Sequence, residues 1–357
     1  MGNGVAIDSS FWSGKRVFVT GHTGFKGSWL SIWLHRLGAK VIGFSLPAPT
    51  TPSIFEQGKI GNIIEQSIIG DITNYNELAD AIAVAKPEII FHMAAQPLVR
   101  KSYDDPITTY YTNVMGTVHL LEAARLCESV RAIVNITTDK CYENQEWHWG
   151  YRENDTLGGY DPYSNSKACA ELVTSAYRQS FLNKASIHVA TVRAGNVIGG
   201  GDWSQDRLIP DLMRALIYKQ HIILRNPDAV RPWQHVLEPL SGYLILAERL
   251  YTQGTAFAQG WNFGPRAEDI QTVQYIVQQL LSKWPGEHSG YEVQQEEEKH
   301  EAKLLMLDCA KASMELGWQP KWNLDQALDA TLEWLLAYLR GEDLLQICDQ
   351  QITQYST

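Results

Sequence analysis

Two side chains with complementary acid–base chemistry stand four residues apart in the segment Tyr163-Ser-Asn-Ser-Lys167. On a helix, this spacing places both side chains on one face. A lysine cation beside a phenol lowers the pKa of the phenol and stabilises the phenolate, so Tyr163 is predicted to act as an acid–base group near neutral pH. Such a pair also occurs by chance, and these two residues alone do not establish a site.

A second polar cluster, Thr137-Thr138-Asp139-Lys140, closes the β-branched run AIVNITT. If that run is a strand of an open parallel sheet, the cluster faces the crevice beyond the carboxyl ends of the strands, where ligands bind. Its hydroxyl, carboxyl and amine groups are suited to hydrogen bonding and proton transfer. The alternative is a turn at the end of the strand, with Lys140 in solvent.

The segment RVFVTGHTGFKGSWL is the strongest local signal, because a predicted strand leads into Gly21, Gly24 and Gly27 and then into an apolar helix. Glycines there allow a tight turn and let the helix N-terminus approach a pyrophosphate. The spacing is G-x-x-G-x-x-G instead of the commoner G-x-G-x-x-G, so three packing glycines are the alternative. The flanking strand and helix favour a dinucleotide site.

Nothing acidic stands at the end of the second predicted strand, VIGFSLPAP, where a dinucleotide site usually has an acid for the adenosine ribose. Ser45 lies near that position. No arginine is present there to bind a 2′-phosphate, so the sequence favours NAD by elimination. Asp71 and Ile72, after the third predicted strand, are candidates to flank the adenine, and a simple turn aspartate is an equal alternative.

These groups need a parallel sheet to bring them together, and the first half of the chain has the matching pattern of βαβ units. Strands are predicted at 16–20, 40–45, 67–70, 88–93, 132–138 and 186–193, and helices near 26–37, 74–85, 107–128 and 162–183. Asp161 as a cap and Pro162 in the first turn mark the start of the last helix. After residue 193 the alternation breaks down, which predicts a second region interleaved with the first.

Composition limits the function classes. The 357 residues are 45% hydrophobic and 20% charged, which suits one large or two smaller globular units. The net charge of −10 argues against a nucleic-acid partner. We expect an unexported, cytoplasmic protein without a membrane span, and reduced cysteines. The acidic run at 296–298 is interpreted as a solvated face.

Ten histidines are present, but none stands in an H-E-x-x-H motif or a paired Cys/His spacing. No metal site is therefore predicted. His92, inside a predicted strand, is expected to be a buried packing residue. His22, inside the glycine loop, is expected to do no more than cover the cofactor phosphates.

Together these residues resemble the extended short-chain dehydrogenase/reductase family along the whole chain. Further matching motifs are HMAAQ (92–96), TNVMGT (112–117), VRAGNVIGGGD (192–202) and WNFGP (261–265). Within the family the chain is similar to nucleotide-sugar 4,6-dehydratases, which place a Thr-Asp pair like Thr138-Asp139 beside the sugar. The segments GHTGFKGSWL, TTDKCYEN, GGGDW with DRLIPD, and RPWQHVLEPLSGYL resemble most closely the dehydratases of CDP-glucose.

The resemblance implies bound NAD+ and conversion of CDP-glucose to CDP-4-dehydro-6-deoxy-D-glucose and water. Tyr163 would take the proton of the 4-hydroxyl while hydride leaves carbon 4, Thr138 would hydrogen-bond the 4-oxygen, and Lys167 would bind the nicotinamide ribose. Asp139 would protonate the departing 6-hydroxyl before hydride returns to carbon 6. Lys140 stands where better-known dTDP-glucose dehydratases carry Glu. It inherits the place of the base at carbon 5, or it holds a water or stabilises the enolate.

The resemblance also supplies the remaining binding residues and the domains. The expected cofactor contacts are Gly21, Thr23, Gly24, Phe25, Gly27, Ser45, Asp71, Ile72, Ala94, Ala95, Tyr163 and Lys167. The expected substrate contacts are Gln96, Asn196, Arg207 and Arg231. Arg193 is a further candidate, with support of the sheet as the alternative. Trp203, Trp233 and Tyr103 are candidates for the pocket wall, with core packing as the alternative for most of the tryptophans. The implied fold is α/β, a Rossmann-like doubly wound parallel sheet with a smaller α/β C-terminal substrate-binding domain. The NAD-binding domain would span 1–190 and about 233–260, and the nucleotide-sugar-binding domain 191–232 and 261–357.

Two alternatives remain. A related dehydratase or epimerase would act on a dTDP-, UDP- or GDP-hexose, but an epimerase needs no acid such as Asp139 for a 6-hydroxyl. A non-catalytic dinucleotide sensor would need neither Tyr163 nor Lys167. Relatives self-associate through amphipathic helices, so 107–128 and 162–183 are expected to form a homo-oligomer, either a dimer or a tetramer. Sugars of the predicted product class usually feed deoxysugar building for surface polysaccharides.

Overall fold

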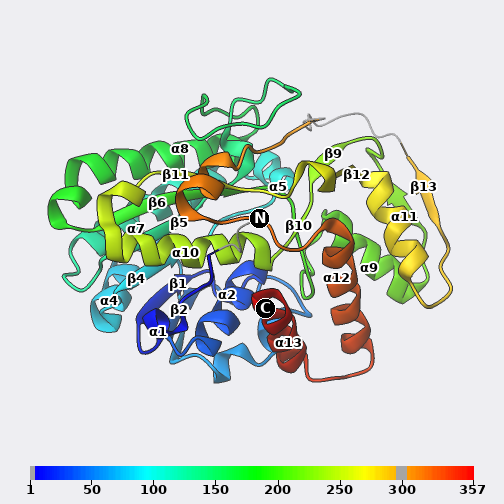
Figure 1. The fold of residues 1–357 in the computed structure, drawn as a ribbon, viewed down its shortest axis with the longest axis horizontal. Coiled ribbons are helices and arrows are strands. Elements are labelled where there is room, and N and C mark those ends of the chain that lie inside the picture. The colour runs from blue at the N-terminus through cyan, green and yellow to red at the C-terminus, as the bar shows by residue number, and fades with distance from the viewer. Residues whose placement is uncertain (1–4, 295–303) are drawn as a thin grey trace.

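The computed structural model describes residues 5–294 and 304–357, and its centre is a seven-stranded parallel sheet (Figure 1). The strand order is β11-β6-β5-β4-β1-β2-β3. The strands are β1 Arg16–Thr20, β2 Lys40–Ser45, β3 Gln66–Ile69, β4 Ile89–His92, β5 Ala132–Ile136, β6 His188–Ala194 and β11 Gly260–Phe263. The order reverses at β1, which pairs with β2 on one side and β4 on the other, so a ligand crevice is expected there. The predicted doubly wound α/β fold is confirmed.

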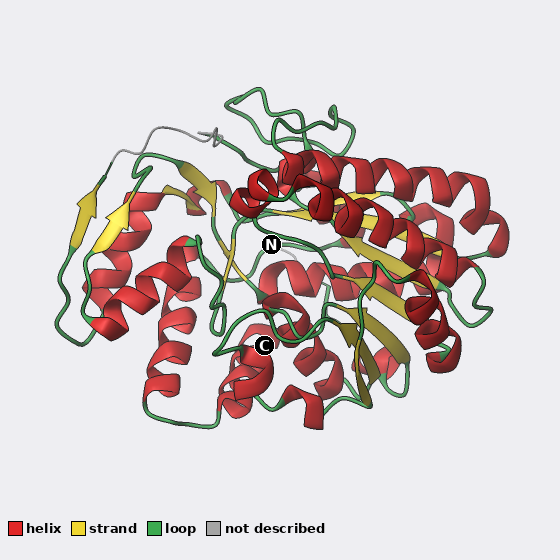
Figure 2. Ribbon diagram, turned by 180° about the vertical axis from the view of Figure 1, so that it is seen from behind, coloured by secondary structure: helices red, strands yellow, loops and turns green. Residues whose placement is uncertain are grey.

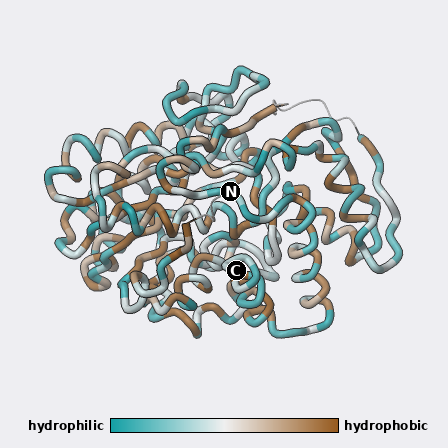
Figure 3. The backbone as a smooth tube through the Cα atoms, viewed as in Figure 1, coloured by the Kyte–Doolittle hydropathy of each residue, from teal (hydrophilic) through white to brown (hydrophobic). Residues whose placement is uncertain are grey.

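Both faces of the sheet are covered by helices, because successive side chains of a buried strand point to opposite sides. In β1, Val17 and Val19 join one apolar cluster, and Phe18 between them joins the other. In Figure 3, where the backbone is coloured by the hydropathy of each residue, apolar stretches run through the interior of the molecule. The helices before residue 260 are α1 Ser9–Trp12, α2 Phe25–Arg36, α3 Ile54–Gln57, α4 Tyr75–Ala85, α5 Val99–Asp104, α6 Pro106–Tyr110, α7 Gly116–Arg125, α8 Pro162–Tyr177, α9 Leu208–Tyr218 and α10 Leu237–Gln253.

The helix predicted at 107–128 is interrupted. It consists of α6, a π-helical turn at Tyr111–Met115 (η2) and α7. Asn113, in this turn, is buried, accepts a hydrogen bond from the amide of Gln96 at 2.8 Å and donates to Ser166 Oγ at 2.9 Å. The wider turn allows this inward contact, as π-bulges at functional sites often do. A second π-helical turn, Arg178–Leu182 (η4), continues α8.

After residue 193, α10 packs on the central sheet and β11 belongs to it, whereas the other elements lie beside that sheet in Figure 2. They include α11 Val273–Lys283, α12 Leu324–Leu339 and α13 Leu344–Ser356. Three two-stranded sheets pair β7 Val197–Ile198 with β10 Gln234–His235, β9 Val230–Pro232 with β12 Ile270–Thr272, and β8 Ile222–Leu224 with β13 Tyr291–Val293. The short turns are η1 Ile60–Asn62, η3 Asp139–Cys141, η5 Asn183–Ala185, η6 Gly254–Phe257, η7 Ala267–Asp269 and η8 Ala312–Leu316.

The domain division stays a prediction, and its boundary at residue 261 crosses β11, which belongs to the central sheet. Helix α13 likewise packs on α2, beside that sheet. The acidic run at 296–298 lies outside the described residues. Within the described part of the chain, no helix is both long enough and apolar enough to cross a membrane.

Candidate active site

The turn after β1 accepts only glycine at two positions. Gly21 has φ +78°, and a Cβ there would lie 2.8 Å from the amide nitrogen of Ala94. A Cβ on Gly27 would lie 2.1 Å from the carbonyl oxygen of Gly21, so α2 packs directly against the turn. Gly24 caps α2 without a side-chain hydrogen bond, which leaves the first amide groups of the helix without intrahelical acceptors. This narrow cradle of amide groups fits a pyrophosphate.

Hydroxyl groups stand at the end of β2, where many dinucleotide sites have an acid. The hydroxyl of Thr23 donates to the carbonyl oxygen of Leu46 at 2.9 Å and lies 2.9 Å from Ser45 Oγ. Because Thr23 has a single hydrogen to donate, Ser45 donates to Thr23, and its lone pairs can accept hydrogen bonds from a ribose. The ring of His22 packs against Gly43 of β2, and its role over the cofactor phosphates stays a prediction. His22 is buried with its Nε2 2.7 Å from Ser67 Oγ, and burial lowers its pKa to about 4.

The two residues predicted to flank the adenine lie just beyond β3. Asp71 Oδ1 accepts a hydrogen bond from the amide of Thr73 at 2.8 Å, which is the turn role named as the alternative. Ile72 is buried against α7, where a Cβ on Gly116 would lie 2.5 Å from its Cδ1. Both residues thus have structural contacts, and their contact with adenine stays a prediction.

The chain after β4 is fastened to β1 through Thr20. Its Oγ1 accepts hydrogen bonds from the amides of Met93 and Ala94, both at 3.1 Å, and lies 2.8 Å from His92 Nδ1. Ala94 and the following Ala95 are thereby held beside the glycine turn. Burial lowers the pKa of His92 to about 3, so this residue is a neutral packing residue, as predicted.

A cavity of about 450 Å³ lies beyond the carboxyl ends of β5 and β6. Four of the five predicted catalytic residues line it, namely Thr138, Asp139, Lys140 and Tyr163. Thr138 and the two residues after it follow β5, and Tyr163 lies in the first turn of α8, which begins after the predicted cap Asp161. The sheet and the helix start therefore deliver these groups to one place, as the sequence predicts.

Asp139 is a buried carboxyl group in the wall of this cavity. Its Oδ1 accepts a hydrogen bond from the Thr138 hydroxyl at 3.0 Å, whereas its Oδ2 has no hydrogen-bond partner among the described residues. Gly195 leaves room for this oxygen, because a Cβ there would lie 3.1 Å from it. Burial raises the pKa of Asp139, and the Lys140 ammonium opposes this shift. A carboxyl group with a raised pKa can hold a proton and donate it.

Tyr163 and Lys167 are both buried on α8. Burial raises the pKa of Tyr163 to about 12, and a hydrogen bond with Thr138 acts in the opposite direction. Lys167 Nζ donates to the carbonyl oxygen of Ile136 at 3.1 Å, and burial lowers its pKa to about 8. The expectation that Lys167 lowers the phenol pKa is therefore not met: burial is the largest effect on Tyr163, and the hydrogen bond that lowers its pKa is with Thr138.

One turn beyond Lys167, Glu171 forms a buried ion pair with Arg193 of β6. The Nε–Oε1 and Nη2–Oε2 distances are both 2.9 Å, and each side chain is 4% exposed. The hydroxyls of Thr137 and Thr191 also donate to this carboxylate. The bidentate geometry fastens α8 to the two strands beneath it and so positions the acid–base face. Arg193 supports the sheet, as predicted.

Three of the four predicted substrate residues, Asn196, Arg207 and Arg231, line the same cavity. Arg207 Nη1 lies 3.0 Å from Oδ2 of Asp202, so a buried carboxylate holds its guanidinium in place. Arg231 Nη1 donates to the carbonyl oxygen of Val230 at 2.9 Å. Guanidinium groups fixed in this manner are suited to a diphosphate.

Gln96, the fourth, does not line the cavity, contrary to the prediction. Its Nε2 donates to the carbonyl oxygen of Leu98 at 3.1 Å and to the Thr109 hydroxyl at 2.9 Å, and its Oε1 accepts from the amide of Leu98. Because these internal bonds engage both ends of the side-chain amide, Gln96 shapes the loop before α5 and lies behind the wall.

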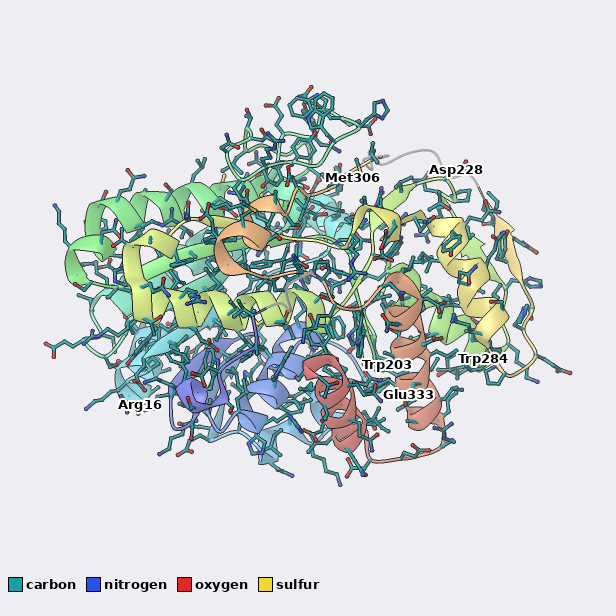
Figure 4. The ribbon with its side chains drawn as sticks, in the orientation of Figure 1. Arg16, Trp203, Asp228, Trp284, Met306 and Glu333 are labelled. Atoms are coloured by element: carbon teal, nitrogen blue, oxygen red, sulfur yellow. The ribbon has the colours of Figure 1, made fainter. Side chains whose placement is uncertain are left out.

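The three aromatic candidates divide in the same manner. Trp233 and Tyr103 line the cavity. Trp203 instead packs against Trp334 and Tyr338 of α12, as Figure 4 shows for its position beside that helix. It is a core residue.

Sequence reasoning missed several charged residues of the cavity wall. Burial lowers the pKa of Lys26 to about 8, with Arg207 acting in the same direction. The position of Lys26 inside the glycine motif is the sequence feature that could have identified it. The others are Arg100 in α5, Arg225 after β8, and three aspartates, Asp202, Asp206 and Asp211, whose segments GGGDW and DRLIPD had not been assigned to the site. Six Lys or Arg side chains and four Asp side chains line the cavity, whereas the whole chain is acidic. The local excess of basic groups favours an anionic ligand.

Comparison with known proteins agrees with this site. The family model described as GDP-mannose 4,6 dehydratase matches residues 18–331. The chain is 57% identical over 354 residues to a CDP-glucose 4,6-dehydratase of Salmonella typhimurium (strain LT2), covering 98% of each chain. It is 27% identical over 326 residues to a dTDP-glucose 4,6-dehydratase of Streptomyces antibioticus, covering 89% of this chain and 91% of that one.

Solved structures share the fold. A UDP-glucose 4-epimerase of Thermotoga maritima with UDP-glucose has a TM-score of 0.77 at 20% identity, covering 90% of this chain and 99% of that one. A dTDP-glucose 4,6-dehydratase of Bacillus anthracis str. Ames in complex with NAD has a TM-score of 0.75 at 24% identity, covering 93% and 99%. The overall topology is therefore that of nucleotide-sugar dehydratases and epimerases.

Proposed function

This chain belongs to the GDP-mannose 4,6 dehydratase family, and we propose that it is a NAD-dependent hydro-lyase that converts CDP-D-glucose to CDP-4-dehydro-6-deoxy-D-glucose and water. The 57% identity to a CDP-glucose 4,6-dehydratase supports the choice of substrate. The observation that carries the reaction type is the buried Asp139 carboxyl, whose unpartnered Oδ2 lies in the cavity wall with Tyr163. Loss of water requires an acid at this place, whereas epimerisation does not.

The glycine cradle is suited to the NAD pyrophosphate, because Gly21 and Gly27 leave no room for a Cβ and the α2 amide groups face the same turn. Ser45 and Thr23 would hold the adenosine ribose, and Lys167 the nicotinamide ribose. When bound, NAD would supply the acceptor for the hydride of sugar carbon 4 and the donor of that hydride to carbon 6. NAD-bound solved relatives of the same fold support this choice of cofactor.

The chain's own residues move the protons. Tyr163 accepts the proton of the 4-hydroxyl, and Thr138 hydrogen-bonds the 4-oxygen. The resulting 4-ketone acidifies the hydrogen on carbon 5, which a base removes as the bond from carbon 6 to oxygen breaks. Asp139 donates its proton to the departing hydroxyl, which leaves as water. The base then returns a proton to carbon 5 as carbon 6 receives the hydride, which completes the 4-dehydro-6-deoxy sugar.

We assign the base at carbon 5 to Lys140, which lines the cavity next to Asp139. Its backbone amide donates to Thr138 Oγ1 at 3.3 Å, which fixes the start of the side chain relative to the 4-oxygen site. Lys140→Met keeps the length of the side chain and removes the amine. We expect this variant to lose exchange of the carbon 5 hydrogen with solvent, as followed by NMR. Exchange at the wild-type rate would exclude Lys140 as the base.

The deciding experiment uses CDP-glucose with deuterium on carbon 4. We expect the pure protein with NAD to move the label to carbon 6 without net NADH formation, as read by mass spectrometry and NMR. Label that is lost to solvent or stays on carbon 4 would contradict the mechanism. Parallel reactions with dTDP-, UDP- and GDP-glucose test which nucleobase the substrate carries. Preference for any of these sugars over CDP-glucose would exclude the proposed substrate.

The assignments of the substrate residues and of the domains remain part of the proposal. Arg207, Arg231 and Asn196 would bind the diphosphate of the sugar nucleotide. We retain the two-domain division, with the nucleotide sugar bound mainly by residues 191–232 and 261–357.

All five cysteines are described and each is a free thiol, which supports a cytoplasmic setting. The product would be a precursor in the biosynthesis of deoxysugars for surface polysaccharides.

A homo-oligomer is also proposed. Exposed apolar side chains gather on the adjacent elements α6, η2 and α8, with Ile107 81%, Tyr111 50% and Leu172 59% exposed. Helix faces of this kind are typical of subunit interfaces. A second copy of the chain would cover them, as a dimer or within a tetramer.

A further inference from the structure

Three charged side chains from separate segments meet at the mouth of the cavity, and we call them the mouth clasp (Arg100, Asp206 and Arg225). Asp206 Oδ1 lies 3.4 Å from Arg225 Nη1 and 3.8 Å from Arg100 Nη1. Arg100 is in α5, Asp206 precedes α9, and Arg225 follows β8. All three line the cavity that contains Asp139. One carboxylate thus joins two guanidinium groups that come from different parts of the fold.

The position of Asp206 is set by the backbone as well as by the two arginines. Its φ is +57°, a left-handed conformation that aspartate and asparagine adopt more readily than most residues. The base of its loop is held by Arg214, which donates to the carbonyl oxygens of Trp203 at 2.8 Å and Ser204 at 3.1 Å. The loop therefore presents this carboxylate at the mouth.

The clasp differs from the other arginine–aspartate pair of the cavity wall, although the Arg207 side chain is itself 35% exposed. Arg207 is paired at 3.0 Å with Asp202, whose side chain is 5% exposed. The clasp side chains are 37%, 42% and 40% exposed for Arg100, Asp206 and Arg225, and their distances exceed those of a strong charge-assisted hydrogen bond. Exposed pairs of this kind are weak and readily exchanged. A diphosphate carries more charge and more acceptor oxygens than one carboxylate, so it is the better partner for both guanidinium groups.

We infer that Asp206 is an internal substitute for substrate phosphate, which holds Arg100 and Arg225 at the mouth until the diphosphate of the incoming nucleotide sugar displaces it. The identity of the ligand rests on the proposed function. Arg100 and Arg225 are then diphosphate-binding residues in addition to Arg207 and Arg231. Asp206 is a positioning residue that lowers the affinity of the cavity for phosphate-bearing ligands by competing with them.

The test is Asp206→Asn, which removes the charge, nearly keeps the size and suits the left-handed backbone. We expect calorimetry to give a Kd for CDP about threefold lower or more, and the KM for CDP-glucose to fall in parallel while kcat changes by less than about twofold. The difference should shrink at high salt. The Kd for NAD should not change, which separates this pyrophosphate site from that of the cofactor. Arg225→Gln should instead raise the Kd for CDP.

The matched control is Asp228→Asn, because Asp228 is exposed on the turn after Arg225 and lies outside the cavity lining (Figure 4). It should leave the Kd for CDP unchanged. Weaker CDP binding by Asp206→Asn would overturn the inference, because Asp206 would then hold the two arginines in the position that binds the diphosphate and would not compete with it. Equal gains in both Asp variants would overturn it too, since net charge would explain them.

Failure of the proposed function would look different. A wild-type protein that converts another sugar nucleotide but not CDP-glucose would contradict the substrate assignment, and the clasp would then be tested with the corresponding nucleoside diphosphate. A wild-type protein that converts CDP-glucose, together with an Asp206→Asn variant whose Kd for CDP equals that of wild type, would overturn only the clasp. Thermal unfolding of each variant establishes that it is folded.

Discussion

At the scale of single residues, the surroundings of Asp139 favour the protonated form that an acid needs. The surroundings of Tyr163 also favour the protonated form, which is not the form that a base needs. Burial raises both pKa values, which favours the protonated form of each side chain. For Asp139 this is the form that donates a proton to a departing hydroxyl. For Tyr163 the neutral phenol is favoured, and the hydrogen bond with Thr138 offsets the effect of burial only in part.

Asp139→Asn tests the acid. The amide keeps the shape of the carboxyl group but has no proton to give to the 6-hydroxyl, so kcat should fall by about 10²- to 10⁴-fold, the usual contribution of a general acid. Product formation is followed by mass spectrometry, and CDP binding by calorimetry should stay within about twofold. In wild type the activity should decline as pH rises through the raised pKa, because the acid is then deprotonated, and this limb should vanish in the variant.

Asp211→Asn is the control for this experiment, because it makes the same carboxyl-to-amide change in the wall of the same cavity, at a residue that is paired with Arg214. It should keep near-wild-type activity. An Asp139→Asn variant within about tenfold of wild type would exclude the assigned acid.

At the scale of elements, α8 positions the acid–base face through the Glu171–Arg193 pair. Glu171→Gln leaves the Arg193 guanidinium buried without a counter-charge, and the free energy of unfolding should fall by about 3–5 kcal/mol. Denaturant unfolding measures this. The double variant Glu171→Met with Arg193→Met should lose less stability, because no charge remains buried. A loss below about 1 kcal/mol in Glu171→Gln would show that the pair does not anchor the helix.

Helix α10 carries two acidic side chains that hold the chain's terminal regions. Glu238 accepts hydrogen bonds from the amide of Trp322 at 2.7 Å and from the hydroxyl of Tyr355 at 2.7 Å. Glu248 accepts one from Trp12 Nε1 at 2.6 Å. Burial raises the pKa of each carboxyl group from 4.5 to about 7. Between these pH values the folded protein binds more protons than the unfolded chain, so these groups lower the free energy of unfolding as pH rises.

The pH dependence of stability should therefore reveal both groups. The free energy of unfolding, measured by denaturant titration at several pH values between 4.5 and about 7, should show a smaller decline with pH in Glu238→Gln than in wild type. The decline should be smallest when Glu248→Gln is added. An unchanged slope in the double variant would contradict the assignment.

The elements also show how far sequence reasoning reaches. The first six strands lie within two residues of their predicted ends, because runs such as Val17-Phe18-Val19 are apolar on both faces, as a buried parallel strand requires. The π-helical turn around Asn113 was missed, since its cause is a contact with Gln96 and Ser166 that is distant in sequence.

In the candidate site, too, sequence reasoning identified the residues that stand in local motifs and missed those that depend on tertiary contacts. Thr138, Asp139 and Tyr163 were found because strand ends and helix starts bring motifs to one crevice. The mouth clasp, by contrast, joins a residue of α5 to two loop residues, and no local pattern encodes their meeting. The raised pKa of Tyr163 was missed as well, because burial is a property of the folded chain.

At the scale of the whole molecule, the apolar surface of α6, η2 and α8 leads to the last prediction. Ile107 and Leu172 belong to adjacent elements and are 81% and 59% exposed, so a carboxylate at either position costs little in the monomer but would be buried within a subunit interface. Wild type should sediment at equilibrium as a dimer or tetramer at micromolar concentration, and Ile107→Asp with Leu172→Asp should raise the dissociation constant more than about tenfold. Val84→Asp, on α4 and 78% exposed, should leave it unchanged. A monomeric wild type would exclude the oligomer, and a double variant that stays associated would move the interface elsewhere, because buried, unpaired carboxylates are not tolerated there.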